Sequence, residues 1–110
     1  ASLDLNKFDR MVYESWPASV IRAKGLCYFS DNTDKAYLFE QAGRQKTVRD
    51  AGLWYATMPP DELADTMARN PQLRRDWDSE YGDRMQKIVF IGQKMDRTEI
   101  EQLMDSCLAD

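Results

Sequence analysis

An unbroken apolar run, Ile88-Val89-Phe90-Ile91, is the feature that most limits how this chain can fold. β-Branched and aromatic residues favour a strand, and a run without alternating polar residues is typical of a strand covered on both faces. We therefore expect a strand from Met85 to Ile91 at the centre of a sheet. The rest of the chain must then supply its neighbouring strands.

Hydrophobic periodicity and turn residues divide the rest of the chain into short elements. A helix is expected from Leu5 to Trp16, with Asp4 or Asn6 as its N-cap, because apolar residues recur there at helical spacing and Pro17 ends the pattern. Further elements are expected as strands over 20–29, 36–41, 45–50 and 53–58, a helix over 61–69, a helical turn around Leu73, and a last helix that starts at Asp96-Arg97-Thr98-Glu99. The order α-β-β-β-β-α-β-α indicates the α+β class, with a mostly antiparallel sheet of four to five strands and helices packed on one face.

Three local patterns add detail. The strand over 20–29 places Arg22 and Lys24 on one face and Ile21 and Ala23 on the other, and Gly25 within it predicts a bulge or the close approach of another backbone. The sequence 42–44 predicts a hairpin loop, and the charged strand after it is typical of a sheet edge. The pair at 51–52 is expected to end that strand.

The charge balance and hydropathy exclude several classes of function. The 110 residues fit one domain over residues 1–110. Lys and Arg number 15 against 19 Asp and Glu, a net charge of −4, which argues against a nucleic-acid or anionic-membrane partner. No apolar run approaches the roughly 20 residues of a membrane span, and the first residues show no signal-peptide pattern.

The chain contains no histidine, which removes most self-contained catalytic and metal chemistry. Without imidazole there is no Ser-His or Cys-His nucleophile and no histidine-based zinc or iron site. Cys27 and Cys107 are far apart and form no CxxC pair, so we expect buried, reduced thiols and a cytoplasmic location. No phosphate-binding glycine loop of the GxxxxGK[ST] or GxGxxG kind occurs. We therefore predict no catalytic, cofactor-binding or metal-binding residue in this chain.

The acidic stretch from Asp76 to Asp83 is the first candidate for a functional segment. Alternating carboxylates can bind Ca²⁺, but counting from Asp76 puts Tyr81 where a calcium loop needs glycine and Lys87 where it needs glutamate. The favoured interpretation is an irregular loop in which Asp and Ser side chains accept hydrogen bonds from backbone N–H groups. A metal-dependent hydrolase that uses these carboxylates is an alternative.

The basic strand face is the second candidate. Arg22 and Lys24 on one face of a strand are suited to an acidic partner surface. The sequence Lys24-Gly25 followed by aromatic residues is also a weak match to an RNA-recognition strand, with Leu26 and Cys27 at positions that do not fit. A stand-alone domain that binds a small ligand or a nucleic acid is therefore a second alternative.

Four sequence blocks together resemble the C-terminal domain of the CobW/YjiA-like P-loop GTPases. Trp77-Asp78-Ser79-Glu80-Tyr81-Gly82-Asp83-Arg84-Met85-Gln86-Lys87 leads into the apolar strand and Gly92, and is similar to the family's Trp-Asp-Pro-Glu-Trp-Gly-Asp-Arg-Arg-Gln-Glu-like run. Ser79 stands where the family has Pro, and Tyr81 where it has Trp. The supporting blocks, in the family's order, are 22–25, 36–43 and 52–56.

The resemblance implies a fragment of a larger metallochaperone GTPase, without the family's histidine-rich inserts. The GTP, Mg²⁺ and transition-metal sites (zinc or cobalt) are expected in a preceding GTPase domain, and none of their residues has a counterpart here. The implied partners are that N-terminal GTPase domain and a client metalloprotein, with no nucleic acid and no membrane, in metal-cofactor insertion or cobalamin synthesis. The candidate partner-binding residues are Arg22, Lys24, Asp78, Glu80, Asp83 and Arg84.

Overall fold

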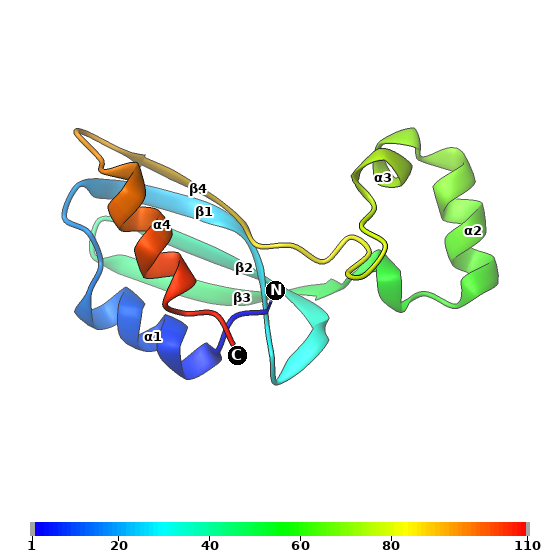
Figure 1. The fold of residues 1–110 in the computed structure, drawn as a ribbon, viewed down its shortest axis with the longest axis horizontal. Helices are drawn as coiled ribbons and strands as arrows, with labels where there is room; N and C mark the ends of the chain where they lie inside the picture. The colour runs from blue at the N-terminus through cyan, green and yellow to red at the C-terminus, as the bar shows by residue number, and fades with distance from the viewer. Residues whose placement is uncertain (1, 110) are drawn as a thin grey trace.

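A computed structural model describes residues 2–109 and confirms the α+β class (Figure 1). The four strands form one antiparallel sheet in the order β3-β2-β1-β4. The elements are α1 (Leu5–Glu14), β1 (Val20–Phe29), β2 (Asn32–Ala42), β3 (Gln45–Leu53), the 3₁₀ helix η1 (Tyr55–Thr57), α2 (Pro60–Arg69), α3 (Pro71–Asp76), β4 (Lys87–Gly92) and α4 (Arg97–Asp105).

The apolar run forms a strand, β4, but the prediction of a central strand covered on both faces is wrong. β4 lies at the edge of the sheet and pairs with β1. Its side chains alternate, with Ile88 and Phe90 half-buried and Val89 and Ile91 exposed at 58% and 54%. Helices α1 and α4 cover the other face, so the side of β4 that carries Val89 and Ile91 is open.

The predicted fourth strand over 53–58 is also wrong. β3 continues through Ala51 to Leu53, because the pairing with β2 shifts by one residue at Ala51 and the strand bends without ending. Gly52 makes this bend with a φ of +95°, and its N–H donates to the Asp50 carboxylate at 2.7 Å. Residues 55–57 then form η1. The prediction that 45–50 is an edge strand is confirmed. The hairpin loop expected over 42–44 is confirmed as a turn at 43–44, with Ala42 still paired in β2.

β1 has the predicted bounds, and its two faces differ from the expectation at one residue. Ile21 is exposed and does not share the buried face with Ala23, because the pairing with β4 shifts between Val20 and Arg22. At Gly25 the predicted close approach is confirmed: a Cβ atom there would lie 1.9 Å from the Lys87 carbonyl oxygen. Only glycine permits this spacing between β1 and β4.

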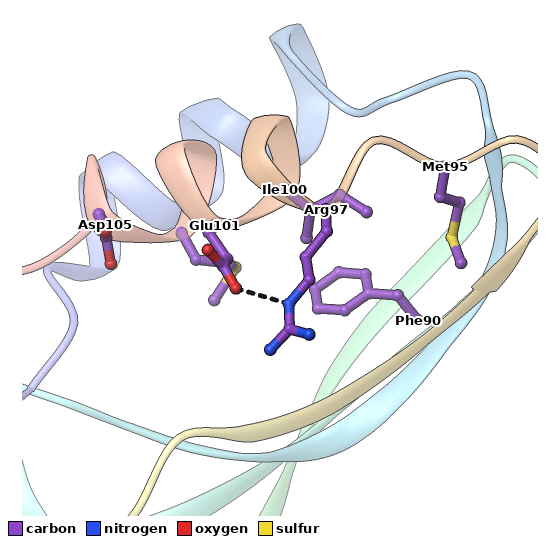
Figure 2. A pocket seen from close by; sticks show the side chains of 7 residues that line it. Phe90, Met95, Arg97, Ile100, Glu101 and Asp105 are labelled. Atoms are coloured by element: carbon purple, nitrogen blue, oxygen red, sulfur yellow. Dashed lines mark hydrogen bonds and ion pairs between the residues drawn. The ribbon is translucent and has the colours of Figure 1, made fainter.

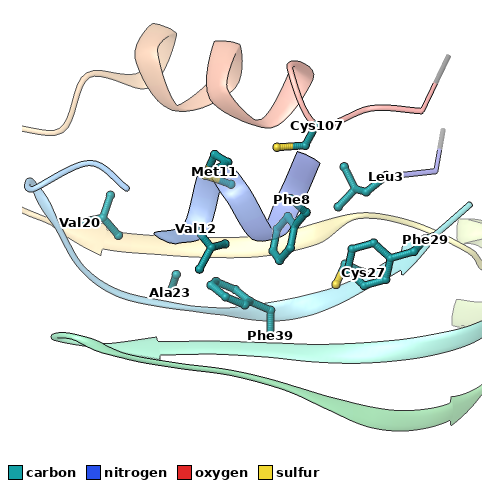
Figure 3. Close-up of a cluster of buried hydrophobic side chains, with 10 residues drawn as sticks. All are labelled: Leu3, Phe8, Met11, Val12, Val20, Ala23, Cys27, Phe29, Phe39 and Cys107. Atoms are coloured by element: carbon teal, nitrogen blue, oxygen red, sulfur yellow. The ribbon is translucent and has the colours of Figure 1, made fainter. Parts of the chain in front are cut away.

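The main core lies between the sheet and the helices α1 and α4 (Figure 3). Phe8 of α1 sits edge-on to two sheet rings, Phe29 at 5.5 Å and Phe39 at 5.2 Å. Asp4 caps α1 and Asp96 caps α4, so the predicted helix starts are confirmed, although α1 ends at Glu14. The buried members of the core are Leu3, Phe8, Met11, Val12, Val20, Ala23, Cys27, Phe29, Phe39 and Cys107.

Helices α2 and α3 lie beyond one end of the sheet, so the helices on its covered face are α1 and α4 (Figure 1). The molecule is accordingly elongated, 46 × 27 × 23 Å. Asn70 ends α2, and its side chain accepts a hydrogen bond from the Leu73 N–H to start α3. No helix within residues 2–109 is long and apolar enough to cross a membrane.

Candidate partner-binding surface

The signature loop, residues 77–84, begins with a tight turn built around Asp78. The Asp78 carboxylate accepts hydrogen bonds from the N–H groups of Glu80 at 2.7 Å and Tyr81 at 2.9 Å. These two donors hold the pKa of Asp78 below its usual range. The backbone of Asp78 also exchanges two hydrogen bonds with Gly82. The predicted loop, in which an Asp side chain satisfies backbone donors, is confirmed at Asp78.

Asp83 connects the same loop to the start of η1. Its two carboxylate oxygens accept hydrogen bonds from the N–H groups of Tyr55 and Ala56, each at 2.8 Å. These are orphan donors at a helix N-terminus, where a carboxylate is the favoured acceptor. Asp83 therefore fixes the path of the chain between β3 and α2.

Arg84 and Gly82 attach the loop to the sheet and to η1. The Arg84 guanidinium donates to the Thr33 carbonyl at 2.8 Å and pairs with the Asp34 carboxylate at 3.0 Å. Gly82 has a φ of +70°, and a Cβ atom there would lie 2.7 Å from the Ala56 Cβ. The signature loop is thus the joint that holds α2 and α3 at the end of the sheet.

The four candidate loop residues differ in whether their side chains are bound within the chain. Asp78, Asp83 and Arg84 are engaged in hydrogen bonds within the chain, whereas Glu80 is exposed at the tip of the loop. Their role in partner binding stays a prediction. The carboxylates of Asp78 and Asp83 each accept two backbone N–H groups, which argues against the alternative of a metal-dependent hydrolase.

Arg22 and Lys24 lie on the outer face of the sheet, the face turned away from α1 and α4. Opposite them across the β1–β4 ladder are Ile91 and Val89. The four side chains border a shallow depression of about 350 Å³. Sequence reasoning missed the two β4 residues, because it placed them in a covered strand. The exposed apolar members of this half of the face are Ile21, Leu26, Val89 and Ile91.

The cations of the sheet differ in whether they form an ion pair. On β2 and β3, Arg49 pairs with Glu40 and Lys35 pairs with Asp50. In the described part of the chain, Arg22, Lys24 and Lys87 of β1 and β4 form no ion pair. Glu40 is the neighbour of Lys24 on β2, but it pairs with Arg49. Cations outside any ion pair and exposed apolar surface therefore coincide on the β1–β4 half of the outer face.

A groove of about 550 Å³ runs along the other side of β4, between this strand and α4 (Figure 2). Its apolar lining comes from Phe90, Met95, Ile100 and Met104. Its polar border carries Asp105 and the ion pair of Arg97 with Glu101 at 2.9 Å. This β4–α4 groove and the depression on the outer face flank the same strand edge.

The aromatic residues and cysteines of β1 are structural. Tyr28 and Phe29 are 2% and 1% exposed, so neither ring can stack on a base, and Tyr28 packs edge-on against Trp54 at 5.9 Å. Burial raises the pKa of the Cys27 thiol to about 12 and also raises that of Cys107. Within residues 2–109, no three His, Cys, Asp or Glu side chains come together in a group that could hold a metal ion.

Comparison with known proteins identifies the family of this chain and a relative. The family described as the cobalamin synthesis protein cobW C-terminal domain matches residues 1–108. A protein of Dictyostelium discoideum, zinc-regulated GTPase metalloprotein activator 1, is 30% identical over 90 residues, which are 81% of this chain and 19% of the relative. The chain therefore corresponds to about a fifth of that relative's length. No solved structure matches the chain.

Proposed function

The chain belongs to the cobW C-terminal domain family, and from this membership we propose that it is the partner-recognition and regulatory module of a GTPase that handles metal for a metalloprotein. The match over residues 1–108 is the observation that carries the proposal. The proposed partners are an N-terminal GTPase domain of the same protein and a client metalloprotein. The proposed setting is the cytoplasm, in metal-cofactor insertion or cobalamin synthesis.

The relative supports the connection to a GTPase and to metal. Its name describes a zinc-regulated GTPase that activates a metalloprotein, and the matched segment is 19% of its length. The remaining length of such a protein has room for a GTPase domain. In this proposal GTP, Mg²⁺ and a transition metal such as zinc or cobalt are bound there.

The residues of this chain do not fit a bound GTP, Mg²⁺ or transition metal. The sequence contains no glycine-rich phosphate loop. The loop carboxylates that could serve a cation, Asp78 and Asp83, already accept backbone N–H groups. We therefore assign the chain a binding role without a catalytic step.

The outer face of the sheet supports a recognition role. Exposed apolar side chains beside Arg22 and Lys24, two cations that form no ion pair within residues 2–109, are suited to a protein surface of opposite charge. Glu80 at the tip of the signature loop is a further candidate contact. The other loop residues would act by holding α2 and α3 in place.

The proposal is tested on the complete reading frame that contains this chain. We expect that frame to encode a P-loop GTPase domain and the purified intact protein to hydrolyse GTP, whereas residues 1–110 alone do not. A frame without a P-loop domain would overturn the proposal and favour the stand-alone binding domain.

A further inference from the structure

We infer that the free edge of β4 captures an extended segment of a partner protein, in which acidic side chains alternate with apolar ones. The inference deepens the proposed function and rests on it, since it describes how the recognition module would hold its partner. Strand addition of this kind takes affinity from backbone hydrogen bonds and specificity from the alternating side chains.

The first observation is the direction of the backbone groups of β4. The Gln86 side chain makes hydrogen bonds with both backbone groups of Tyr28, accepting from its N–H at 3.2 Å and donating to its carbonyl at 2.9 Å. The backbone groups of Tyr28 therefore point toward β4, and by alternation so do those of Lys24 and Leu26, which are paired with Val89 and Lys87.

The pairing with β1 leaves the backbone groups of alternate β4 residues free. Since Lys87 and Val89 bond to β1, the N–H and C=O groups of Ile88 and Phe90 point toward the open edge. No other strand of residues 2–109 pairs with that edge. An extended segment can therefore continue the sheet there.

The second observation is that the two sides of this edge differ in chemistry. Alternate side chains of an added strand would lie on opposite sides of the sheet. On the covered side they meet the β4–α4 groove, with apolar walls from Phe90 and Ile100 (Figure 2). Met104 also lines this groove. On the outer side they meet the depression beside Val89 and Ile91.

Charge determines which side chains go to which side. Arg22, Lys24 and Lys87 on the outer side form no ion pair within residues 2–109, since Glu40, opposite Lys24 on β2, pairs with Arg49. The three cations therefore favour carboxylates of a partner. On the other side, Asp105 borders the groove beside the Arg97–Glu101 ion pair, so the net charge of the groove is negative and disfavours carboxylates. The captured segment is therefore expected to present acidic residues outward and apolar residues into the groove.

The same charges disfavour a second copy of this chain as the occupant. Two β4 edges paired with each other would bring the cations of the two outer faces together. Like charges on neighbouring strands are destabilising. A partner with acidic residues relieves this repulsion, and we therefore assign the edge to a different protein.

The test uses the 110-residue chain and a synthetic peptide that matches the six residues of β4, with Glu and Ile alternating. Affinity is measured by fluorescence anisotropy, and amide hydrogen exchange is followed by NMR. We expect binding that weakens with salt, and slower exchange at Ile88 and Phe90. Arg22→Glu should weaken binding about fivefold or more, since it replaces an attraction by a repulsion. Arg44→Glu, in the hairpin turn at the far edge, is the matched control and should bind as the wild type does.

Four results would overturn the inference: no binding of the acidic peptide, equal binding of a Lys-Ile peptide, tighter binding of a single-stranded RNA, or binding without protection at Ile88 and Phe90. Because the chain is tested without any GTPase domain, these results are independent of the reading-frame test. If the reading frame encodes a GTPase domain but the β4 edge binds no peptide, the proposed function stands and only the strand addition is rejected.

Discussion

Gly25 controls how closely β1 and β4 approach, and Gly25→Ala should destabilise the fold by separating them. The added Cβ would lie 1.9 Å from the Lys87 carbonyl oxygen and 2.5 Å from the Ile88 Cα, whereas real Cβ contacts do not fall below 3.0 Å. The oxygen must therefore move by 3.0 − 1.9 = 1.1 Å or more. Both opposing atoms belong to the backbone, so no side chain can rotate to make room.

The expected magnitude follows from the hydrogen bonds of the β1–β4 ladder. A shift of this size would lengthen two or three neighbouring bonds beyond hydrogen-bond distance, and each contributes about 1 kcal/mol. We expect a loss of about 2–4 kcal/mol in the free energy of unfolding, a large part of the typical total for a domain of this size. The midpoint of thermal unfolding should fall by roughly 8–16 °C.

Urea unfolding followed by tryptophan fluorescence measures this loss. Gly43→Ala is the matched control, because Gly43 has a φ of +58° but nothing within 4 Å of its added Cβ. It should cost only backbone strain, about 1 kcal/mol. A loss below about 0.5 kcal/mol for Gly25→Ala, or rescue of that variant by Ile88→Ala, would refute the backbone-contact argument.

Three further predictions concern the loop and the thiols. Asp83→Ala removes the acceptor of two N–H groups of η1 and should lower the free energy of unfolding by about 1–2 kcal/mol, measured by thermal unfolding. Asp83→Asn keeps one acceptor oxygen, so its loss of stability should be about half as large. Equal losses for the two variants would contradict the capping role. Hydrogen bonds hold the pKa of Asp78 below its unfolded value, so Asp78 stabilises the fold above about pH 4 and this contribution is lost as the pH falls through its folded-state pKa. Asp78→Asn should therefore lose less stability than the wild type between about pH 5 and pH 2 in acid titrations by circular dichroism, and parallel curves would exclude this contribution. Because burial raises the pKa of both thiols, Cys27 and Cys107 should resist alkylation by iodoacetamide at about pH 8 until urea unfolds the chain. Mass spectrometry counts the alkylated cysteines. Stoichiometric labelling of the native chain would contradict the burial of the two thiols.

The sequence predicted most elements of the fold because their signals are local. Asp4 and Asp96 as helix caps and the turn at 43–44 depend on neighbouring residues and were confirmed. The position of β4 in the sheet was not predictable in this way. Its apolar run predicts a strand. Whether Val89 is covered depends on which elements lie next to β4, and these contacts are long-range in the sequence.

The candidate site was predictable in part. Arg22 and Lys24 were placed correctly on one face of β1 by period-two alternation. Val89 and Ile91 were missed, although the same alternation along β4 would have separated them from Ile88 and Phe90. The roles of Asp83 and Arg84 could not be predicted from spacing, because their partners Tyr55 and Thr33 lie far away in the sequence.

The β1–β4 half of the outer face, with the edge of β4, is the proposed recognition site for an acidic partner segment. Amide hydrogen exchange at Ile88 and Phe90 is the decisive measurement, since the N–H groups of both residues point toward the open edge. With saturating Glu-Ile peptide, exchange at both amides should slow by about tenfold or more as these groups enter new hydrogen bonds. Unchanged exchange at both amides, with the peptide bound, would contradict the account.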